Sequence, residues 1–481
     1  MRMRLAALAA LLLPLSAAAF QPELAGLAAL PQALLPAAEV QAEIGHHKEQ
    51  PLRYAVGHAL ALDQRNGAWD EASPGVARWR LRIASEGARS LSLHLQGLRL
   101  PPATELWLYG ADGRDVQGPF SASNVRAGEL WLPIVRASEA VLELRLPAAA
   151  QSALRLQVAE AFHGYRSFQE AGAPPKAAIG DDAGSCNINV ACSAGNSWRN
   201  EIRATVLLTR PVVGGQVLCS GTLMNNALLD NRALVLTANH CGITASNVSS
   251  VRAYFNVQSA SCNGTDDGRV DQNMAGESFL AGTSSLPDND VDTDFTLITL
   301  AGTVPSTFNA LYAGWDARSS ATPTSGVAIH HPQGDEKKIS VYSSSASKVE
   351  DVAIGSIGDS FTVDAWQVRW AQGTTETGSS GSALWNQNHQ VVGMLSGGGA
   401  SCEDPDQPDF FARLERAWTA NSASNGQLKA HLDPTNSGSL TLNSKDAGSS
   451  GTLPDNSSGG GGAFGGLLLL LPALRRRRRA P

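Results

Sequence analysis

The chain has 481 residues, of which 43% are hydrophobic and 17% charged, so it is long enough for two or three globular domains. Its formal net charge is −7, but residues 177–446 carry 15 Lys+Arg against 27 Asp+Glu, a net charge of −12. An acidic domain of this kind repels phosphate backbones and attracts basic peptides, which argues against nucleic acid as a partner.

The first residues have the features of a secretory signal peptide. Arg2 and Arg4 precede an apolar run from Leu5 to Leu15, and small residues in an A-x-A-like pattern follow. The apolar run is shorter than the ~20 residues that a membrane-spanning helix needs. We therefore expect residues 1–19 to be removed by cleavage after Ala19 and the remaining chain to be exported.

Residues 20–176 are predicted to contain a small β-sandwich. Short strands are separated by turns at the spacing typical of such a fold, and the expected strands are Trp79–Ile83, Leu91–Leu98, Leu106–Tyr109, Glu129–Val135 and Val141–Leu146. The segment has no cysteine and no recognisable catalytic constellation. It is therefore expected to assist or inhibit the domain that follows it.

Residues 177–446 are predicted to form a second all-β domain. Gly- and Ser-rich turns separate many short β-type runs, of which the clearest are Ala204–Thr209, Ala233–Thr237, Val251–Val257, Phe295–Leu300 and Val391–Leu395. Only the stretch around residues 413–419 has a helical or mixed pattern. Short strands, long loops and few helices indicate a barrel or sandwich architecture.

The end of the chain is predicted to carry a sorting signal. Residues 447–463 are a Gly/Ser-rich linker, and residues 464–481 hold a short apolar stretch followed by five arginines. This arrangement resembles the Gly-Gly C-terminal sorting tails of bacterial exported proteins, which an intramembrane protease removes. The resemblance implies export and sorting machinery as partners and a transient membrane anchor at the cell surface, with a chance basic tail as the alternative.

All six cysteines lie between residues 186 and 402. An even number in an exported chain indicates three disulfides, and no C-x-x-C pair or clustered His/Cys spacing indicates zinc. The adjacent His330 and His331 are poor metal ligands as a pair, because neighbouring residues on a strand point to opposite faces. We expect neither a metal nor another cofactor.

A serine nucleophile is predicted in the loop Gly378-Ser379-Ser380-Gly381-Ser382. Acyl transfer by serine needs a base for the hydroxyl proton, a carboxylate that orients the base, and amide donors for the oxyanion. Ser380 is the expected nucleophile. The glycines let the backbone turn sharply, so that the amides of Gly378 and Ser380 can point at one oxygen.

The base is predicted to be His240 and the carboxylate Asp294. His240 follows the end of an apolar strand and precedes Cys241, whereas Asp294 directly precedes an apolar run. A charge in that position is costly unless it is paired, and His240 is the obvious partner. The competing carboxylates are expected to be solvated loop acids; they are Asp288, Asp290 and Asp292.

The segments LTANHC, DFTLITL and GSSGSA, in the order His, Asp, Ser, resemble the triad motifs of the chymotrypsin-like serine proteases. The flanking sequence resembles the bacterial lysyl endopeptidases from about Gly184 to Asp433, through GSCNINVAC, AGWD, AIHHP and TTETGSSGSA. The resemblance implies two six-stranded β-barrels with the triad in the cleft between them. It also implies a secreted serine endopeptidase, made as a zymogen, that cleaves on the carboxyl side of lysine or, alternatively, arginine.

The same resemblance chooses among the 15 pairings that six cysteines allow. It implies the disulfides Cys186–Cys402, Cys192–Cys262 and Cys219–Cys241. The last of these would clamp the strand beside His240.

A specificity pocket follows from the resemblance as well. Asp409 looks like the family's pocket aspartate, which pairs with a basic side chain, once a two-residue deletion after Cys402 is allowed. Thr375 and Glu376 would line the same pocket. The strand that hydrogen-bonds the substrate backbone would comprise Ser396, Gly397 and Gly398. The alternative reading of Asp409 is an exposed loop acid beside Asp404 and Asp406.

The sequence departs from the family in the surroundings of the triad. Ser396 stands where lysyl endopeptidases carry a histidine that stacks on a tryptophan, and no equivalent tryptophan is evident. Ser379 replaces the aspartate that precedes the nucleophile in trypsin, so activation by a new N-terminal ammonium group is not expected. Trp366 and Trp370 are expected to pack in the core or the pocket wall.

The resemblance implies that residues 20–176 are a prosegment whose removal uncovers the cleft. It also implies two partners for the enzyme, which are basic peptides as substrates and this prosegment. Lys176, in an Ala/Pro-rich linker, is the expected self-processing site, with an ordinary linker lysine as the alternative. A noncatalytic surface-binding protein that keeps a protease fold is the alternative function. A third hypothesis assigns binding to the N-terminal sandwich in the mature protein.

Overall fold

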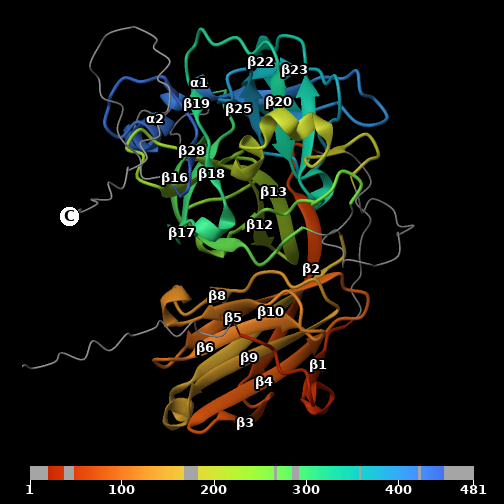
Figure 1. The fold of residues 1–481 in the computed structure, drawn as a ribbon, viewed down its shortest axis with the longest axis vertical. Helices are drawn as coiled ribbons and strands as arrows, with labels where there is room; N and C mark the ends of the chain where they lie inside the picture. The colour runs from red at the N-terminus through yellow and green to blue at the C-terminus, as the bar shows by residue number, and fades with distance from the viewer. Residues whose placement is uncertain are drawn as a thin grey trace, which may run out of the picture.

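The computed structural model describes residues 20–36, 48–166, 183–264, 268–283, 292–356, 359–420 and 424–448. The predicted signal-peptide cut after Ala19, the linker lysine Lys176 and the sorting tail lie outside these residues. Figure 1 shows the N-terminal β-domain in red to yellow, next to a larger β-domain in green to blue. No helix within the described ranges is long and apolar enough to cross a membrane.

The N-terminal domain is a β-sandwich, as predicted. One sheet has the order β1-β4-β9-β6-β7, with β3 added to β4, and the other contains β2, β10, β5 and β8. Their facing side chains form one buried core that includes Trp79, Leu93, Leu142 and Val158. The strands are β1 (Gln32–Leu34), β2 (Leu52–Asp63), β3 (Ala68–Ser73), β4 (Val76–Ala84), β5 (Ser90–Arg99), β6 (Glu105–Gly110), β7 (Gln117–Phe120), β8 (Leu130–Trp131), β9 (Glu139–Pro147) and β10 (Arg155–Gly164).

Four of the five predicted sandwich strands are confirmed, and the fifth is mostly wrong. Within the predicted Glu129–Val135, only Leu130–Trp131 pairs as a strand. Pro133 lies two residues further on and has no amide hydrogen for a sheet, so the regular ladder stops and only a single bridge between Val135 and Leu91 of β5 follows. The sequence reading also missed β2 and β10, the two long strands nearest to the second domain.

The second sheet of the sandwich does not end at the domain border. β2 pairs antiparallel with β13, with Leu52 opposite Leu218 and Val56 opposite Gly215. A single ten-stranded sheet therefore runs from the sandwich into the larger domain, and Figure 1 shows β2 alongside β13.

The first half of the larger domain is a closed six-stranded barrel. Its order is β12-β15-β16-β17-β14-β13, and the pairing of β12 with β13 closes it. Buried Val206, Leu223, Val235 and Ile298 fill its interior. The strands are β12 (Thr205–Val212), β13 (Gly215–Met224), β14 (Arg232–Thr237), β15 (Arg252–Phe255), β16 (Asn273–Gly282) and β17 (Thr296–Thr303).

The second half is built on a further sheet with the order β11-β21-β20-β24-β25-β26-β23-β22, to which β19 and β27 are added. One core cluster joins Leu236 and Leu297 of the first barrel to Ile329 and Met394 of this sheet. The elements are β11 (Ile188–Asn189), β18 (Leu311–Tyr312), β19 (Trp315–Asp316), β20 (Gly326–His330), β21 (Lys338–Tyr342), β22 (Ser347–Ser356), β23 (Asp359–Val368), β24 (Ala383–Asn386), β25 (Val391–Gly398), β26 (Asp409–Arg413), α1 (Leu414–Trp418), α2 (Leu428–Leu432), β27 (Thr441–Leu442) and β28 (Lys445–Asp446).

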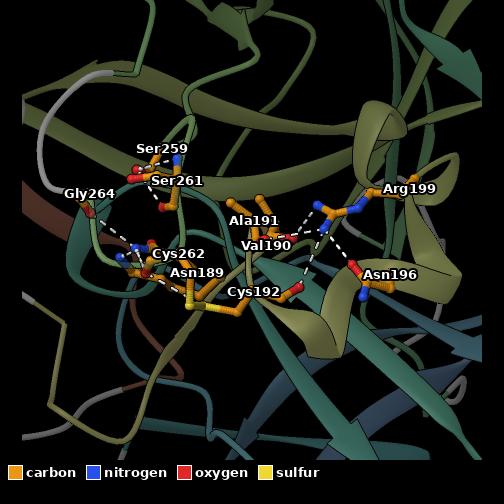
Figure 2. Close-up of a disulfide and its surroundings, with 11 residues drawn as sticks. Asn189, Val190, Ala191, Cys192, Asn196, Arg199, Ser259, Ser261, Cys262 and Gly264 are labelled. Atoms are coloured by element: carbon orange, nitrogen blue, oxygen red, sulfur yellow. Dashed lines mark hydrogen bonds between the residues drawn. A yellow bond between two sulfur atoms is a disulfide. The ribbon is translucent and has the colours of Figure 1, made fainter.

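Three disulfides are present, with the pairings that the resemblance implied: Cys186–Cys402, Cys192–Cys262 and Cys219–Cys241. Figure 2 shows Cys192–Cys262, beside which the Asn189 side chain donates to the carbonyl oxygens of Cys262 and Gly264. Arg199 donates to the carbonyl oxygens of Val190, Ala191 and Cys192. These contacts fix the first residues of the larger domain to its body.

Lys337 is a buried cation at the junction of the two halves. Its ammonium donates to the carbonyl oxygen of Ile202 at 2.8 Å, and its amide donates to Val257 at 2.8 Å. Burial lowers the pKa of Lys337 from 10.5 to about 7. The unfolded chain therefore binds more protons than the folded chain between these pH values, so the folded protein gains stability as pH rises from about 7 to 10.5.

We expect Lys337→Met to stabilise the protein most below pH 7, because methionine removes the cost of burying a charge. The gain should be on the order of a few kcal/mol there and should shrink as pH rises toward 10.5, where the unfolded lysine is also neutral. Thermal unfolding at pH 6 and pH 9 measures this difference. The same change at the exposed Lys348 is the control, and an equal shift of Tm at both pH values for Lys337→Met would contradict the assignment.

Candidate active site

His240 and Asp294 come together because the strands that carry them pair. His240 follows β14 and Asp294 precedes β17, and in the antiparallel β14–β17 ladder Thr237 lies opposite Thr296. Nδ1 of His240 is 2.8 Å from Oδ2 of Asp294, and the His240 amide donates to Oδ1 at 2.9 Å. The carboxylate therefore holds both the ring and the backbone of the histidine.

Asp294 is buried but stays ionised. Burial alone would raise its pKa, but the charge of His240 and the hydrogen bonds from His240 bring the pKa below the ordinary value of 3.8. The hydroxyl of Ser396, on β25, lowers it further. The predicted role of Ser396 through its backbone did not include this effect of its side chain.

Of the competing carboxylates, Asp288 and Asp290 lie outside the described residues. Asp292 is half-buried in its loop and accepts a hydrogen bond from Thr362 at 2.6 Å. Asp292, Asp351 and Asp364 bring carboxylate oxygens within 4.8 Å of one another. Arg413 and Arg416 already pair with Asp364 at 3.1 and 2.6 Å, so we assign no metal to this cluster.

Ser380 lies in a loop that both halves of the domain hold. Its carbonyl accepts from the amide of Ser220 on β13 at 2.9 Å, and the Gly381 amide donates to Leu395 on β25 at 2.9 Å. Gly378 and Gly381 have φ values of 96° and 79°. A Cβ at Gly378 would lie 2.8 Å from the carbonyl oxygen of His331, so the turn requires glycine there.

Ser379, which precedes the predicted nucleophile Ser380, is held by a neutral histidine. Ser340 donates to the carbonyl of Thr374 at 2.5 Å, so its oxygen accepts from Nε2 of His330 at 3.0 Å. Nδ1 of His330 is then the acceptor for the Ser379 hydroxyl at 2.8 Å. Burial lowers the pKa of His330 well below 6.5, so the ring stays uncharged.

The second residue of this histidine pair is structural as well. Nδ1 of His331 lies 3.0 Å from the carbonyl oxygen of Asp335, to which it donates. Burial and the charge of Lys337 lower the pKa of His331 to about 3. Both rings are therefore neutral packing groups that support the nucleophile loop.

Asp409 is the first residue of β26 and is fully buried, whereas Asp404 and Asp406 are exposed. Its Oδ2 accepts from the Thr375 hydroxyl and from the indole N–H of Trp370, each at 2.7 Å. Its Oδ1 is 2.7 Å from Nζ of Lys48, a residue of the N-terminal segment. The reading of Asp409 as an exposed loop acid is therefore wrong.

The remaining predicted pocket residues surround this carboxylate in different ways. Gly398 pairs with Asp409 across β25 and β26, and a Cβ there would lie 2.3 Å from Oδ1, which leaves room only for glycine. Gly397 is the next residue along the same strand edge. The Gly184 amide donates to both carboxylate oxygens of Glu376, at 3.1 Å each. This carboxylate therefore anchors the segment next to the Cys186–Cys402 disulfide.

Two aromatic residues at the site carried no sequence signal for their roles. Phe361 stacks on the His240 ring with centroids 5.6 Å apart, and the sequence reading did not single it out. Trp370, for which packing in the core or the pocket wall was expected, donates a hydrogen bond to Asp409 that was not foreseen. Lys48 was missed altogether, because a lysine in a polar stretch far from the domain has no pattern of its own.

The class of protein follows from this architecture: the chain is a serine protease with a chymotrypsin-like β-barrel domain. Residues 180–412 match the profile of the lysyl endopeptidase C-terminal domain, and residues 26–164 match that of the lysyl endopeptidase N-terminal domain. The chain belongs to the lysyl endopeptidase family.

Among curated proteins, a lysyl endopeptidase from Pseudomonas aeruginosa is 29% identical over 384 residues, which cover 75% of this chain and 79% of the relative. Among solved structures, an active-form protease from M. tuberculosis is similar over 55% of this chain and 94% of its own, with 14% identity and a TM-score of 0.33. A Glu endopeptidase is similar over 48% of this chain and 92% of its own, with 17% identity and a TM-score of 0.29.

We expect Asp294→Asn to lower kcat by about 10⁴-fold, because an amide can neither fix the imidazole tautomer nor stabilise the imidazolium. The His240 amide should still find an oxygen, so the fold and thermal stability should change little near neutral pH. Steady-state hydrolysis of a lysyl peptide by the processed enzyme measures the loss. A decrease below tenfold would show that Asp294 does not orient the base.

Proposed function

We propose that the processed chain hydrolyses peptide bonds on the carboxyl side of lysine. His240 takes the proton of Ser380 as its oxygen attacks the carbonyl carbon, and Asp294 stabilises the imidazolium. The amides of Gly378 and Ser380 donate to the oxyanion. His240 then gives the proton to the leaving amine, and water releases the acyl group by the same steps in reverse.

The proposed preference for lysine rests on the hydrogen bonds that Asp409 already accepts from its own domain. Thr375 and Trp370 both donate to Oδ2, which leaves Oδ1 and the carbonyl oxygen of Ala400 as acceptors for a side chain. An ammonium group is a compact donor and suits two separate oxygens. A guanidinium prefers both oxygens of one carboxylate, and Oδ2 is occupied.

The mass-spectrometric digest of a denatured protein tests the function. We expect fragment ends after lysine, with few after arginine, from the processed wild-type enzyme. Ser380→Ala is the matched control and should lower the rate by about 10⁶-fold, because the nucleophile is lost. Cleavage without preference for basic residues, or undiminished cleavage by Ser380→Ala, would refute the proposal.

Trp370→Phe combined with Thr375→Val should weaken the choice of lysine over arginine. Both changes keep most of the side-chain volume but remove the donors to Oδ2, which frees the carboxylate for a bidentate guanidinium. We expect the ratio of kcat/KM for matched lysyl and arginyl peptides to fall about tenfold. An unchanged ratio would mean that pocket depth, and not carboxylate bonding, sets the choice.

The processing of the two ends belongs to the same proposal. Cleavage after Ala19 would release the signal peptide, and cleavage after Lys176 would separate residues 20–176 from the protease domain at 177–446. The Gly/Ser-rich linker and Arg-rich tail at 447–481 would pass the exported protein to C-terminal sorting machinery, with a transient anchor in the membrane. Sequencing the N-terminus of the exported protein tests the cut at Lys176.

A further inference from the structure

The N-terminal segment places a lysine in the pocket of its own protease domain. Residues 20–176 contain 13 arginines but two lysines, Lys48 and Lys176. The Lys48 side chain is 1% exposed, and its ammonium bonds to Oδ1 of Asp409 at 2.7 Å and to the carbonyl oxygen of Ala400. The partner carboxylate lies 361 residues away in the sequence, so this contact exists only because the two domains pack together.

The nucleophile is bonded to the same residue. Oγ of Ser380 donates to the carbonyl oxygen of Lys48 at 2.6 Å. In a reactive complex that proton would point to Nε2 of His240, which would remove it. Here Nε2 of His240 is buried and has no hydrogen-bond partner among the described residues. Lys48 thus sits where a substrate lysine would sit, while Ser380 makes no hydrogen bond to His240.

The chain holds Lys48 in place through a short tether. Residues 48–50 form a turn, Pro51 lines the same small pocket as Cys219 and Cys241, and β2 begins at Leu52, opposite Leu218. Four residues span at most about 14 Å, so Lys48 cannot leave the vicinity of the site while β2 stays paired with β13. A tether of this length gives an effective concentration on the order of millimolar or higher.

We infer that Lys48 is an internal pseudosubstrate by which the N-terminal domain blocks the lysine pocket and disarms Ser380. This inference rests on the proposed function, since it uses the same pocket. Cleavage of the linker between residues 166 and 183 leaves β2 paired with β13, so the block persists after that cut. The protease becomes active when β2 separates from β13 and takes Lys48 out of the pocket.

The test uses the full chain with Ser380→Ala, which cannot process itself. Fluorescence anisotropy measures the binding of a fluorescein-labelled peptide with one internal lysine. We expect Lys48→Met to bind it at least about tenfold more tightly than the parent, because methionine keeps the bulk of the stem but loses the pair with Asp409. Lys348→Met, on the exposed surface of β22, should match the parent. Equal affinity for all three chains would overturn the inference.

A second measurement does not depend on the peptide. In the full chain with Lys176→Gln, a fluorophosphonate should label Ser380 at least about tenfold faster when Lys48→Met is added. Equal labelling rates, or rapid cleavage after Lys48 in the parent, would overturn the inference, because Lys48 would then be no block or an ordinary substrate. If the processed wild-type enzyme cleaves lysyl peptides and these rates are equal, the inference fails while the proposed function stands.

Discussion

The antiparallel pairing of β2 with β13 is the constraint on which the arrangement of this protein depends. It merges one sheet of the N-terminal sandwich with the first barrel, so the two domains share backbone hydrogen bonds as well as side-chain contacts. β13 also carries Cys219 and Ser220, which support the base and the nucleophile loop. The strand that anchors the N-terminal domain is therefore the strand that shapes the cleft.

Two buried carboxylates divide the work of the site. Asp294 accepts hydrogen bonds from both the ring and the amide of His240, which fixes the orientation of that ring. Asp409 has one oxygen bonded to Thr375 and Trp370 within the protease domain and the other bonded to Lys48 of the N-terminal segment. A buried anion is costly without partners, so the second carboxylate favours a lysine side chain wherever one can reach it.

Internal hydrogen bonds hold the loop that carries Ser380, and no ion pair with a new N-terminus is needed for this. Ser379 bonds to neutral His330, and Ser340 and Thr374 fix the tautomer of that ring. These partners are all internal to the protease domain and are in place in the uncut chain. In the proposed mechanism, latency comes from an occupied pocket, because the framework around Ser380 is already formed.

The sequence by itself determined the fold class, because strand periodicity is a local signal, and through the family resemblance it predicted the disulfide pairings and proposed His240, Asp294, Ser380 and Asp409 as site residues. It also predicted four sandwich strands, but Pro133 ended the fifth, and β2 and β10 were missed because their faces are half-exposed and lack clear alternation. Thr375 was predicted to line the same pocket as Asp409, but only the tertiary structure decided which side chains bond to that carboxylate. Trp370 and Thr375 reach it from 39 and 34 residues away and Lys48 from 361, and such contacts leave no mark on local pattern, because packing and not spacing creates them.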